Sequence, residues 1–231
     1  MKHQLSTNSN SILNAGTFIA NKMNKPDVSP YLAHFTSQKF PKGYKSNNNP
    51  TNLFKYMSAE KRLISILQGK KILSSQVPWV GNHKAVCLTE CPWTSLITHT
   101  KQYSSYGVGF KKEFVFAKGG GPVYYVRADM FNNQKWDQSV LPFVTPFWPE
   151  YVPATLKTTV SMTKCDYTHE REWRVADDLG FEYDDIEFVV LPDYKAMAQF
   201  PKQLKDDIGR DKFLLMENYK KIEELWPVHK L

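Results

Sequence analysis

The residues best suited to chemistry lie in the segment 167–175, which reads Tyr-Thr-His-Glu-Arg-Glu-Trp-Arg-Val. Its aromatic and β-branched residues predict a strand, in which successive side chains point to opposite faces. Glu170, Glu172 and Arg174 would then share one face. Two carboxylates beside a guanidinium either decorate a solvated surface, which is the commoner case for charged residues, or line a polar cleft.

Two other patterns have the spacing or composition of a binding site, and we expect neither to bind a metal or a phosphate. Cys87-x3-Cys91 and Cys165-x3-His169 have spacings that zinc sites tolerate. However, Cys87 lies in an apolar run, where a free cysteine behaves as a small hydrophobic residue, so we expect no metal. Residues 119–121 are three glycines, but no Gly-Lys-Ser/Thr follows them, which predicts a turn and not a phosphate-binding loop.

Composition sets the broad class of the protein. The chain has 231 residues, 42% of them hydrophobic, which is enough for one domain with a substantial core. The formal charge of +7 favours an anionic partner: a nucleotide, a nucleic acid or an acidic protein. The sequence has no apolar run long enough to span a membrane and no signal-peptide pattern, and its three cysteines suit reduced thiols, so we expect a cytoplasmic protein.

The elements that must position these residues indicate an α+β protein. We expect a mobile N-terminal arm over 1–28, rich in Asn, Ser and Lys, and a single domain over 29–231. Hydrophobic patterning predicts helices within 53–69 and 93–103, and an amphipathic helix over 211–226. It predicts strands over 31–36, 85–90, 106–110, 114–117, 123–127, 170–175 and 186–191, with 114–117 and 123–127 forming a hairpin around the glycines.

In this order and spacing, the motifs resemble the ADP-ribosyltransferase superfamily over about residues 31–191. His34-Phe35-Thr36 resembles the motif on the first core strand, Ala85–Glu90 the second strand, and Glu170-Arg171-Glu172 the Glu-x-Glu around the catalytic glutamate. The resemblance implies a split, antiparallel-rich β core flanked by helices. Three segments also resemble abortive-infection proteins of bacterial phage defence, close to DarT-like and mRNA-modifying toxin transferases: 86–92, 106–110 and 170–174.

The resemblance implies a catalytic role for the two glutamates. Loss of nicotinamide from NAD builds positive charge on the ribose, which the carboxylate of Glu172 would stabilise. Glu170 would orient or deprotonate the acceptor. Tyr106 would stack on the nicotinamide ring.

The resemblance also implies which residues hold NAD as co-substrate. His34 would hydrogen-bond the adenosine ribose with help from Thr36. Cys87 stands where several relatives have Tyr, so Thr89 and Tyr106 compete for the middle position of the site.

Five basic residues are candidates for the pyrophosphate and for a polyanionic acceptor, although a solvated face explains each of them equally well: Lys111, Lys112, Lys118, Arg127 and Arg171. The resemblance therefore predicts a toxin that transfers ADP-ribose from NAD to nucleic acid, with RNA preferred over DNA. A protein acceptor is one alternative. A non-catalytic nucleic-acid-binding or regulatory module is another. Such a toxin would need an antitoxin, docked on segment 142–151 or on the C-terminal helix.

Overall fold

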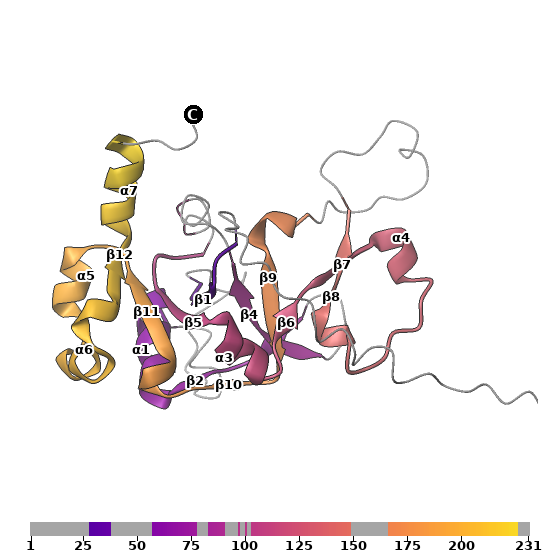
Figure 1. Ribbon diagram of the computed structural model, residues 1–231, viewed down its shortest axis with the longest axis horizontal. Helices are drawn as coiled ribbons and strands as arrows, with labels where there is room; N and C mark the ends of the chain where they lie inside the picture. The colour runs from indigo at the N-terminus through magenta and orange to yellow at the C-terminus, as the bar shows by residue number, and fades with distance from the viewer. Residues whose placement is uncertain are drawn as a thin grey trace, which may run out of the picture.

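A computed structural model describes residues 28–37, 57–77, 83–90, 97, 100, 103–148 and 166–225. Within these ranges the fold is built around one eight-stranded sheet, with helices packed against it (Figure 1). The sequence prediction of a mixed α+β protein with a mostly antiparallel sheet is confirmed. Its assignment to the ADP-ribosyltransferase type of core stays a prediction. The expected N-terminal arm lies almost wholly outside the described residues.

The large sheet has the strand order β12-β11-β5-β1-β4-β9-β6, and β3 pairs with β4 beside this path. Every pairing in it is antiparallel except that of β11 with β12. Its strands are β1 (Tyr31–Phe35), β3 (Ser75–Gln76), β4 (Lys84–Thr89), β5 (Gly107–Lys111), β6 (Gly121–Pro122), β9 (Glu172–Ala176), β11 (Ile186–Leu191) and β12 (Phe213–Leu215). Two small sheets pair β2 (Lys71–Ile72) with β10 (Leu179–Gly180), antiparallel, and β7 (Tyr124–Arg127) with β8 (Val144–Phe147), parallel.

The helices are short and several have clear capping signals. Helix α1 (Ala59–Gly69) begins at Ser58, whose side chain accepts a hydrogen bond from the backbone N–H of Lys61, and ends at Lys70, which adopts a left-handed conformation with φ 48°. The other described helices are α3 (Lys112–Ala117), α4 (Ala128–Phe131), α5 (Tyr194–Gln199), α6 (Lys202–Ile208) and α7 (Met216–Leu225). No helix in the described part of the chain combines the length and the apolar character needed to cross a bilayer.

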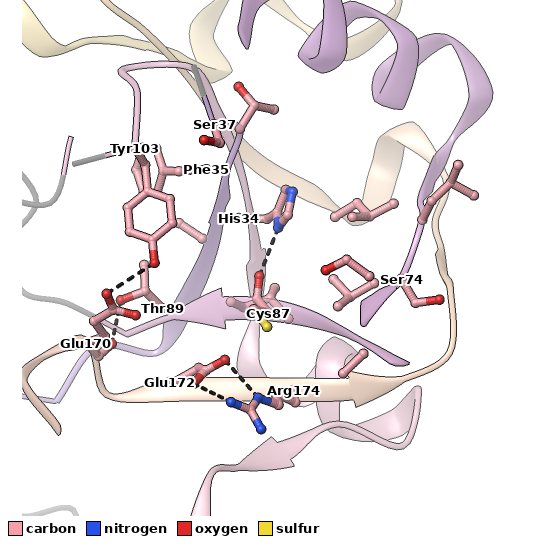
Figure 2. Close-up of a pocket in the computed structure, with 18 of the residues that line it drawn as sticks. His34, Phe35, Ser37, Ser74, Cys87, Thr89, Tyr103, Glu170, Glu172 and Arg174 are labelled. Carbon is pink, nitrogen blue, oxygen red and sulfur yellow. Dashed lines mark hydrogen bonds and ion pairs between the residues drawn. The ribbon is translucent and has the colours of Figure 1, made fainter. Parts of the chain in front are cut away.

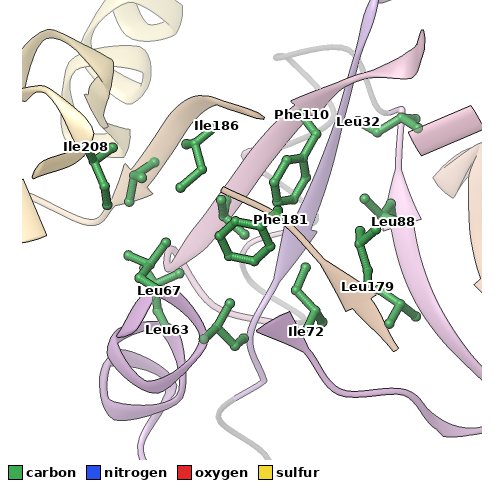
Figure 3. Packing of buried hydrophobic residues seen from close by; sticks show 14 of the residues in the cluster. Leu32, Leu63, Leu67, Ile72, Leu88, Phe110, Leu179, Phe181, Ile186 and Ile208 are labelled. Carbon is green, nitrogen blue, oxygen red and sulfur yellow. The ribbon is translucent and has the colours of Figure 1, made fainter. Parts of the chain in front are cut away.

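The main core lies between the sheet and helix α1. Leu63 and Leu67 of α1 face a cluster that includes Phe110 and Ile186 from the strands (Figure 3). A smaller cluster covers the opposite face, where the ring of Phe188 lies over Gly109. A Cβ atom built at Gly109 would lie 2.2 Å from the Phe188 ring, so this close approach requires glycine.

The structure corrects two of the predicted elements. Residues 114–117 are helical and form most of α3, so the expected hairpin with 123–127 is wrong; β7 pairs instead with β8. The physical reason is that residues 124–127 pair with the distant strand β8, while the helix packs Val115 into the main core and leaves Phe116 70% exposed. The C-terminal helix starts at Met216 and not at Asp211, because Phe213–Leu215 forms strand β12, which pairs with β11.

Candidate functional site

An open pocket of about 780 Å³ lies over β1, β4 and the start of β9 (Figure 2). Antiparallel pairing sets its floor, since Ala33 lies opposite Thr89 and Thr89 lies opposite Glu172. The pocket brings together His34, Thr36, Thr89, Glu170 and Glu172, which are far apart in the sequence. Arg174 also lines it, as do Cys87 and Tyr103, to which the sequence analysis gave no role in the site.

The imidazole of His34 is held in one tautomer. Its Nδ1 lies 2.8 Å from the carbonyl oxygen of Cys87, and because a carbonyl only accepts, Nδ1 carries the proton. Burial lowers the pKa of His34, and the bond to Cys87 only partly opposes this effect. A neutral ring protonated at Nδ1 leaves Nε2 as a hydrogen-bond acceptor. In Figure 2 this second ring nitrogen points away from Cys87.

Arg174 uses all of its hydrogen-bond donors inside the protein. Its Nε and Nη2 donate to the two carboxylate oxygens of Glu172 at 2.8 and 2.9 Å. The remaining N–H groups donate to the carbonyls of Pro142 and Val144 and to the hydroxyl of Thr145. A guanidinium has five N–H groups, so none is left for a ligand. Arg174 therefore joins β9 to the β7–β8 sheet and fixes the orientation of Glu172.

Glu170 reaches the pocket by a route different from the expected strand. It ends a 3-10 turn (Thr168–Glu170), Arg171 follows in a left-handed conformation with φ 44°, and β9 begins only at Glu172. The expectation that Glu170 and Glu172 lie on one face of a single strand is therefore wrong, because Glu170 precedes the strand. They share the pocket because the left-handed conformation of Arg171 changes the direction of the chain between them. In addition, the Thr89 hydroxyl donates a hydrogen bond of 2.5 Å to the carbonyl oxygen of Glu170.

The carboxyl group of Glu170 is held differently from that of Glu172. The hydroxyl of Tyr103 donates to its Oε1 at 3.2 Å. Burial raises the pKa of Glu170 and the negative charge of Glu172 raises it further, while the Tyr103 bond opposes both effects. The same surroundings, burial first and Glu170 second, raise the pKa of Tyr103, so its phenol stays a hydrogen-bond donor.

The two hydroxyl-bearing residues that were expected near NAD have different positions. Thr36 belongs to the pocket lining, but its Oγ1 donates to the carbonyl of Ala59 at 2.9 Å and the residue is 3% exposed. Tyr106 lies outside the described lining and packs against the main core, while its carbonyl accepts from the backbone N–H of Thr36. Tyr103 supplies the phenol in the pocket, and we find no sequence pattern that would have selected it over Tyr106.

Cys87 is an exposed free cysteine in the lining of the pocket. Burial raises the pKa of the Cys87 thiol to about 12, and the charge of Glu172 adds to this effect. The residue is therefore a neutral thiol at physiological pH. Among the described residues, no group of three or more His, Cys, Asp or Glu is arranged to hold a metal ion. The cysteine and histidine pattern with zinc-like spacing cannot be assessed as a whole, because Cys91 and Cys165 lie outside the described ranges.

The five basic residues proposed for nucleic acid lie outside the described lining of the pocket. Three of them form ion pairs with acidic neighbours: Lys111 with Glu187, Lys112 with Glu90, and Arg127 with Asp129. Lys118 lies over the ring of Phe114, and Arg171 is the left-handed residue before β9. These contacts are those of an ordinary charged surface, so a nucleic-acid acceptor stays a prediction.

One comparison with known proteins bears on function. A family model described as "Putative abortive phage resistance protein AbiGi, antitoxin" matches residues 51–225. No curated protein and no solved structure matches the chain. The expected context of phage defence and of a toxin–antitoxin pair is confirmed. The prediction of a toxin that transfers ADP-ribose is wrong, because the family is described as an antitoxin. The use of NAD stays a prediction.

Proposed function

The chain belongs to the AbiGi family of abortive phage resistance, and we propose that it is an antitoxin that neutralises a partner toxin by binding it directly as a folded protein. The observation that carries this proposal is the extent of the family match. It spans residues 51–225, which include helix α1, strands β4, β9 and β11, and most of the pocket lining. Compared with the sequence prediction, the roles are exchanged: the partner is the toxin and this chain restrains it.

The geometry supports a folded inhibitor with a preformed receptor surface. The polar groups of the pocket are already fixed by internal contacts, including the bidentate pair of Arg174 with Glu172 and the bond from His34 to Cys87. A surface that is ordered before association loses little conformational entropy on binding. Concave pockets with a few fixed polar groups are also the usual place where proteins receive a ligand or a partner side chain.

The two surfaces expected to dock a partner differ in the structure. In segment 142–148, Arg174 donates hydrogen bonds to the carbonyls of Pro142 and Val144 and to the hydroxyl of Thr145. These polar groups are therefore used inside the protein and not at its surface. Helix α7 keeps Ile222 59% exposed. We place the toxin contact on the pocket face, since that face gathers fixed polar groups and an apolar lining in one concave surface.

The proposal is tested by co-expression. Each gene flanking the coding sequence of this chain is induced alone and together with the chain, and growth is followed. We expect one flanking gene to arrest growth, the chain to relieve that arrest, and the two purified proteins to co-elute as a complex. The proposal is overturned if the chain relieves no arrest, or if relief occurs while the purified proteins do not associate.

A further inference from the structure

We infer that the pocket receives a tryptophan side chain of the partner toxin, whose indole N–H donates a hydrogen bond to Nε2 of His34. This inference rests on the antitoxin function proposed above and names the contact within it. Its basis is a combination of features on one concave surface: balanced charges, a largely apolar wall and a poorly hydrated hydrogen-bond acceptor. Together these features select a neutral, apolar guest that carries a donor.

The charges of the described lining cancel, so the pocket favours a neutral guest. The carboxylates of Glu170 and Glu172 are matched in number by the guanidiniums of Arg62 and Arg174. Glu172 and Arg174 also pair with each other through two hydrogen bonds. A charged guest would leave water without an excess of opposite charge to receive it, which is costly, whereas a neutral guest avoids that cost.

Most of the accessible surface of the pocket is apolar. Helix α1 contributes Ile66, strand β2 contributes Ile72, and Leu73 follows directly. Leu73 is 50% exposed, so a guest that covers it removes apolar surface from water. The volume of about 780 Å³ admits a large side chain together with its neighbours in the partner chain.

His34 supplies the acceptor. Its Nδ1–H donates to the carbonyl of Cys87, which leaves Nε2 with a lone pair and no proton. No residue in the described part of the chain hydrogen-bonds to Nε2, and Figure 2 shows this nitrogen pointing away from Cys87. Burial removes water from the ring and thereby lowers the pKa of His34. A poorly hydrated acceptor gains free energy when a guest brings it a donor.

Among the amino-acid side chains, tryptophan meets these requirements best. Its indole is neutral, has a large apolar surface, and carries an N–H that donates and does not accept. The hydroxyl of tyrosine also has acceptor lone pairs, which need partners of their own when buried. Serine and threonine bring a donor without the apolar body, and lysine and arginine bring a charge. Tryptophan is also enriched among the residues that anchor one protein in a pocket of another.

The first test uses small probes on the unmodified protein, which protects it against loss of folding. Indole carries the ring and the N–H, and benzofuran has nearly the same shape with an oxygen in place of the N–H. In NMR titrations we expect indole to bind roughly three- to ten-fold more tightly than benzofuran, because one hydrogen bond separates them. Millimolar indole should also weaken the toxin complex more than benzofuran does. Equal binding of the two probes, or binding of neither, would overturn the inference.

The second test measures the dissociation constant of the toxin complex by calorimetry, with matched controls. His34→Phe keeps a ring and removes the acceptor, and its control is His83→Phe, outside the described lining. Leu73→Ala shortens the apolar wall, and its control is Ile222→Ala at a side chain 59% exposed, also outside that lining. We expect His34→Phe to weaken binding about ten-fold, Leu73→Ala several-fold, and both controls to bind as the parent does.

A purely structural role of His34 is separated from recognition by two further readouts. His34→Phe should bind indole and benzofuran equally. One Trp→Phe exchange in the toxin should weaken the complex, and combining it with His34→Phe should cost less than the sum of the two single losses, because both remove the same hydrogen bond. Additive losses for every tryptophan of the toxin would overturn the inference.

The remaining outcomes separate the possible guests and the two proposals. Unchanged toxin affinity in His34→Phe and Leu73→Ala would overturn the inference while leaving the antitoxin function standing. If indole binding depends on His34 but toxin affinity does not, the pocket takes a free aromatic molecule and its assignment to the toxin is wrong. Absence of any complex between the chain and a toxin it suppresses would instead overturn the proposed function itself.

Discussion

Glu170 and Glu172 are two residues apart and share one pocket, yet the protein treats their charges differently. Glu172 is the first residue of β9 and both of its oxygens accept hydrogen bonds from Arg174. Glu170 ends a 3-10 turn, accepts a bond from the neutral Tyr103 hydroxyl, and has a raised pKa. One carboxylate pairs with a buried guanidinium, whereas the other accepts from a phenol and has a pKa raised by burial.

The comparison shows how a pocket can be rigid and receptive at once. The Arg174–Glu172 pair binds β9 to the β7–β8 sheet and keeps the wall in place. Ionisable residues whose pKa values are shifted by burial are frequently functional, because functional sites place them in environments that do not favour the stability of the fold. The following predictions test whether this division between the two glutamates holds, beginning with the largest effect.

The largest effect is expected from Arg174→Met, which leaves the buried carboxylate of Glu172 without its partner. Breaking a buried ion pair by removing one member costs on the order of 3–5 kcal/mol, and the free energy of unfolding measured in urea should fall by about that amount. The double variant Glu172→Gln/Arg174→Met should recover part of the loss, since no unpaired buried charge remains. Arg127→Met breaks an exposed pair with Asp129 and should change the free energy of unfolding far less. A loss at Arg174 no larger than this control would mean that the pair does not brace the pocket.

A smaller effect of opposite sign is expected at Glu170. The folded-state pKa is raised, so the native protein binds more protons than the unfolded chain between the two pKa values, and stability falls as pH rises through that window. Glu170→Gln removes the ionising group, so its melting temperature should exceed that of the parent at pH 8. The difference should shrink as pH falls below the unfolded pKa, near 4.5.

Among the described residues, Glu172, His169 and Arg174 act electrostatically on Glu170. The comparison should therefore be repeated in a His169→Gln background. A parent that is as stable as Glu170→Gln at pH 8 would contradict the raised pKa of Glu170.

The smallest effect concerns the reactivity of Cys87, which lies next to the framework carboxylate. With a pKa raised to about 12 by burial and then by Glu172, the thiol should be alkylated slowly at pH 8. The thiolate fraction falls by roughly three orders of magnitude relative to an ordinary cysteine, and higher nucleophilicity offsets about half of that on a logarithmic scale. Peptide-level mass spectrometry should therefore show Cys87 reacting roughly thirty-fold more slowly in the native than in the urea-unfolded protein. Equal rates in the two states would contradict the structure of the pocket floor.

Several elements were determined by the sequence alone, because their signals are local. The run from Ile186 to Leu191 forms a buried strand, as its continuous apolar character indicates. The predicted strands 85–90 and 31–36 agree with β4 and β1 to within one residue at each end. The helix ending near Gly69 was also predictable, although the left-handed residue is Lys70. Such signals depend on each segment's own periodicity and caps, which do not change with the rest of the fold.

The apolar run at 114–117 shows where local signals fail. Its aromatic content is typical of a strand, but residues 124–127 pair with β8, and 114–117 form helix α3, which packs Val115 into the main core. The C-terminal segment fails in the same way, because Phe213–Leu215 finds a partner in β11. Pairing with a distant strand overrides intrinsic preference, and pairing is invisible in a single sequence.

The pocket depended on both levels. The types of His34, Glu170 and Glu172 and their order along the chain singled them out, because charged and titratable residues in strand-like segments are uncommon. Only the tertiary structure could reveal that Arg174 is fully occupied, that Tyr103 and not Tyr106 reaches Glu170, and that burial raises the pKa of Glu170. Residue types fix which chemistry is available, but burial and the neighbours from other strands decide the charge state in which each group is held.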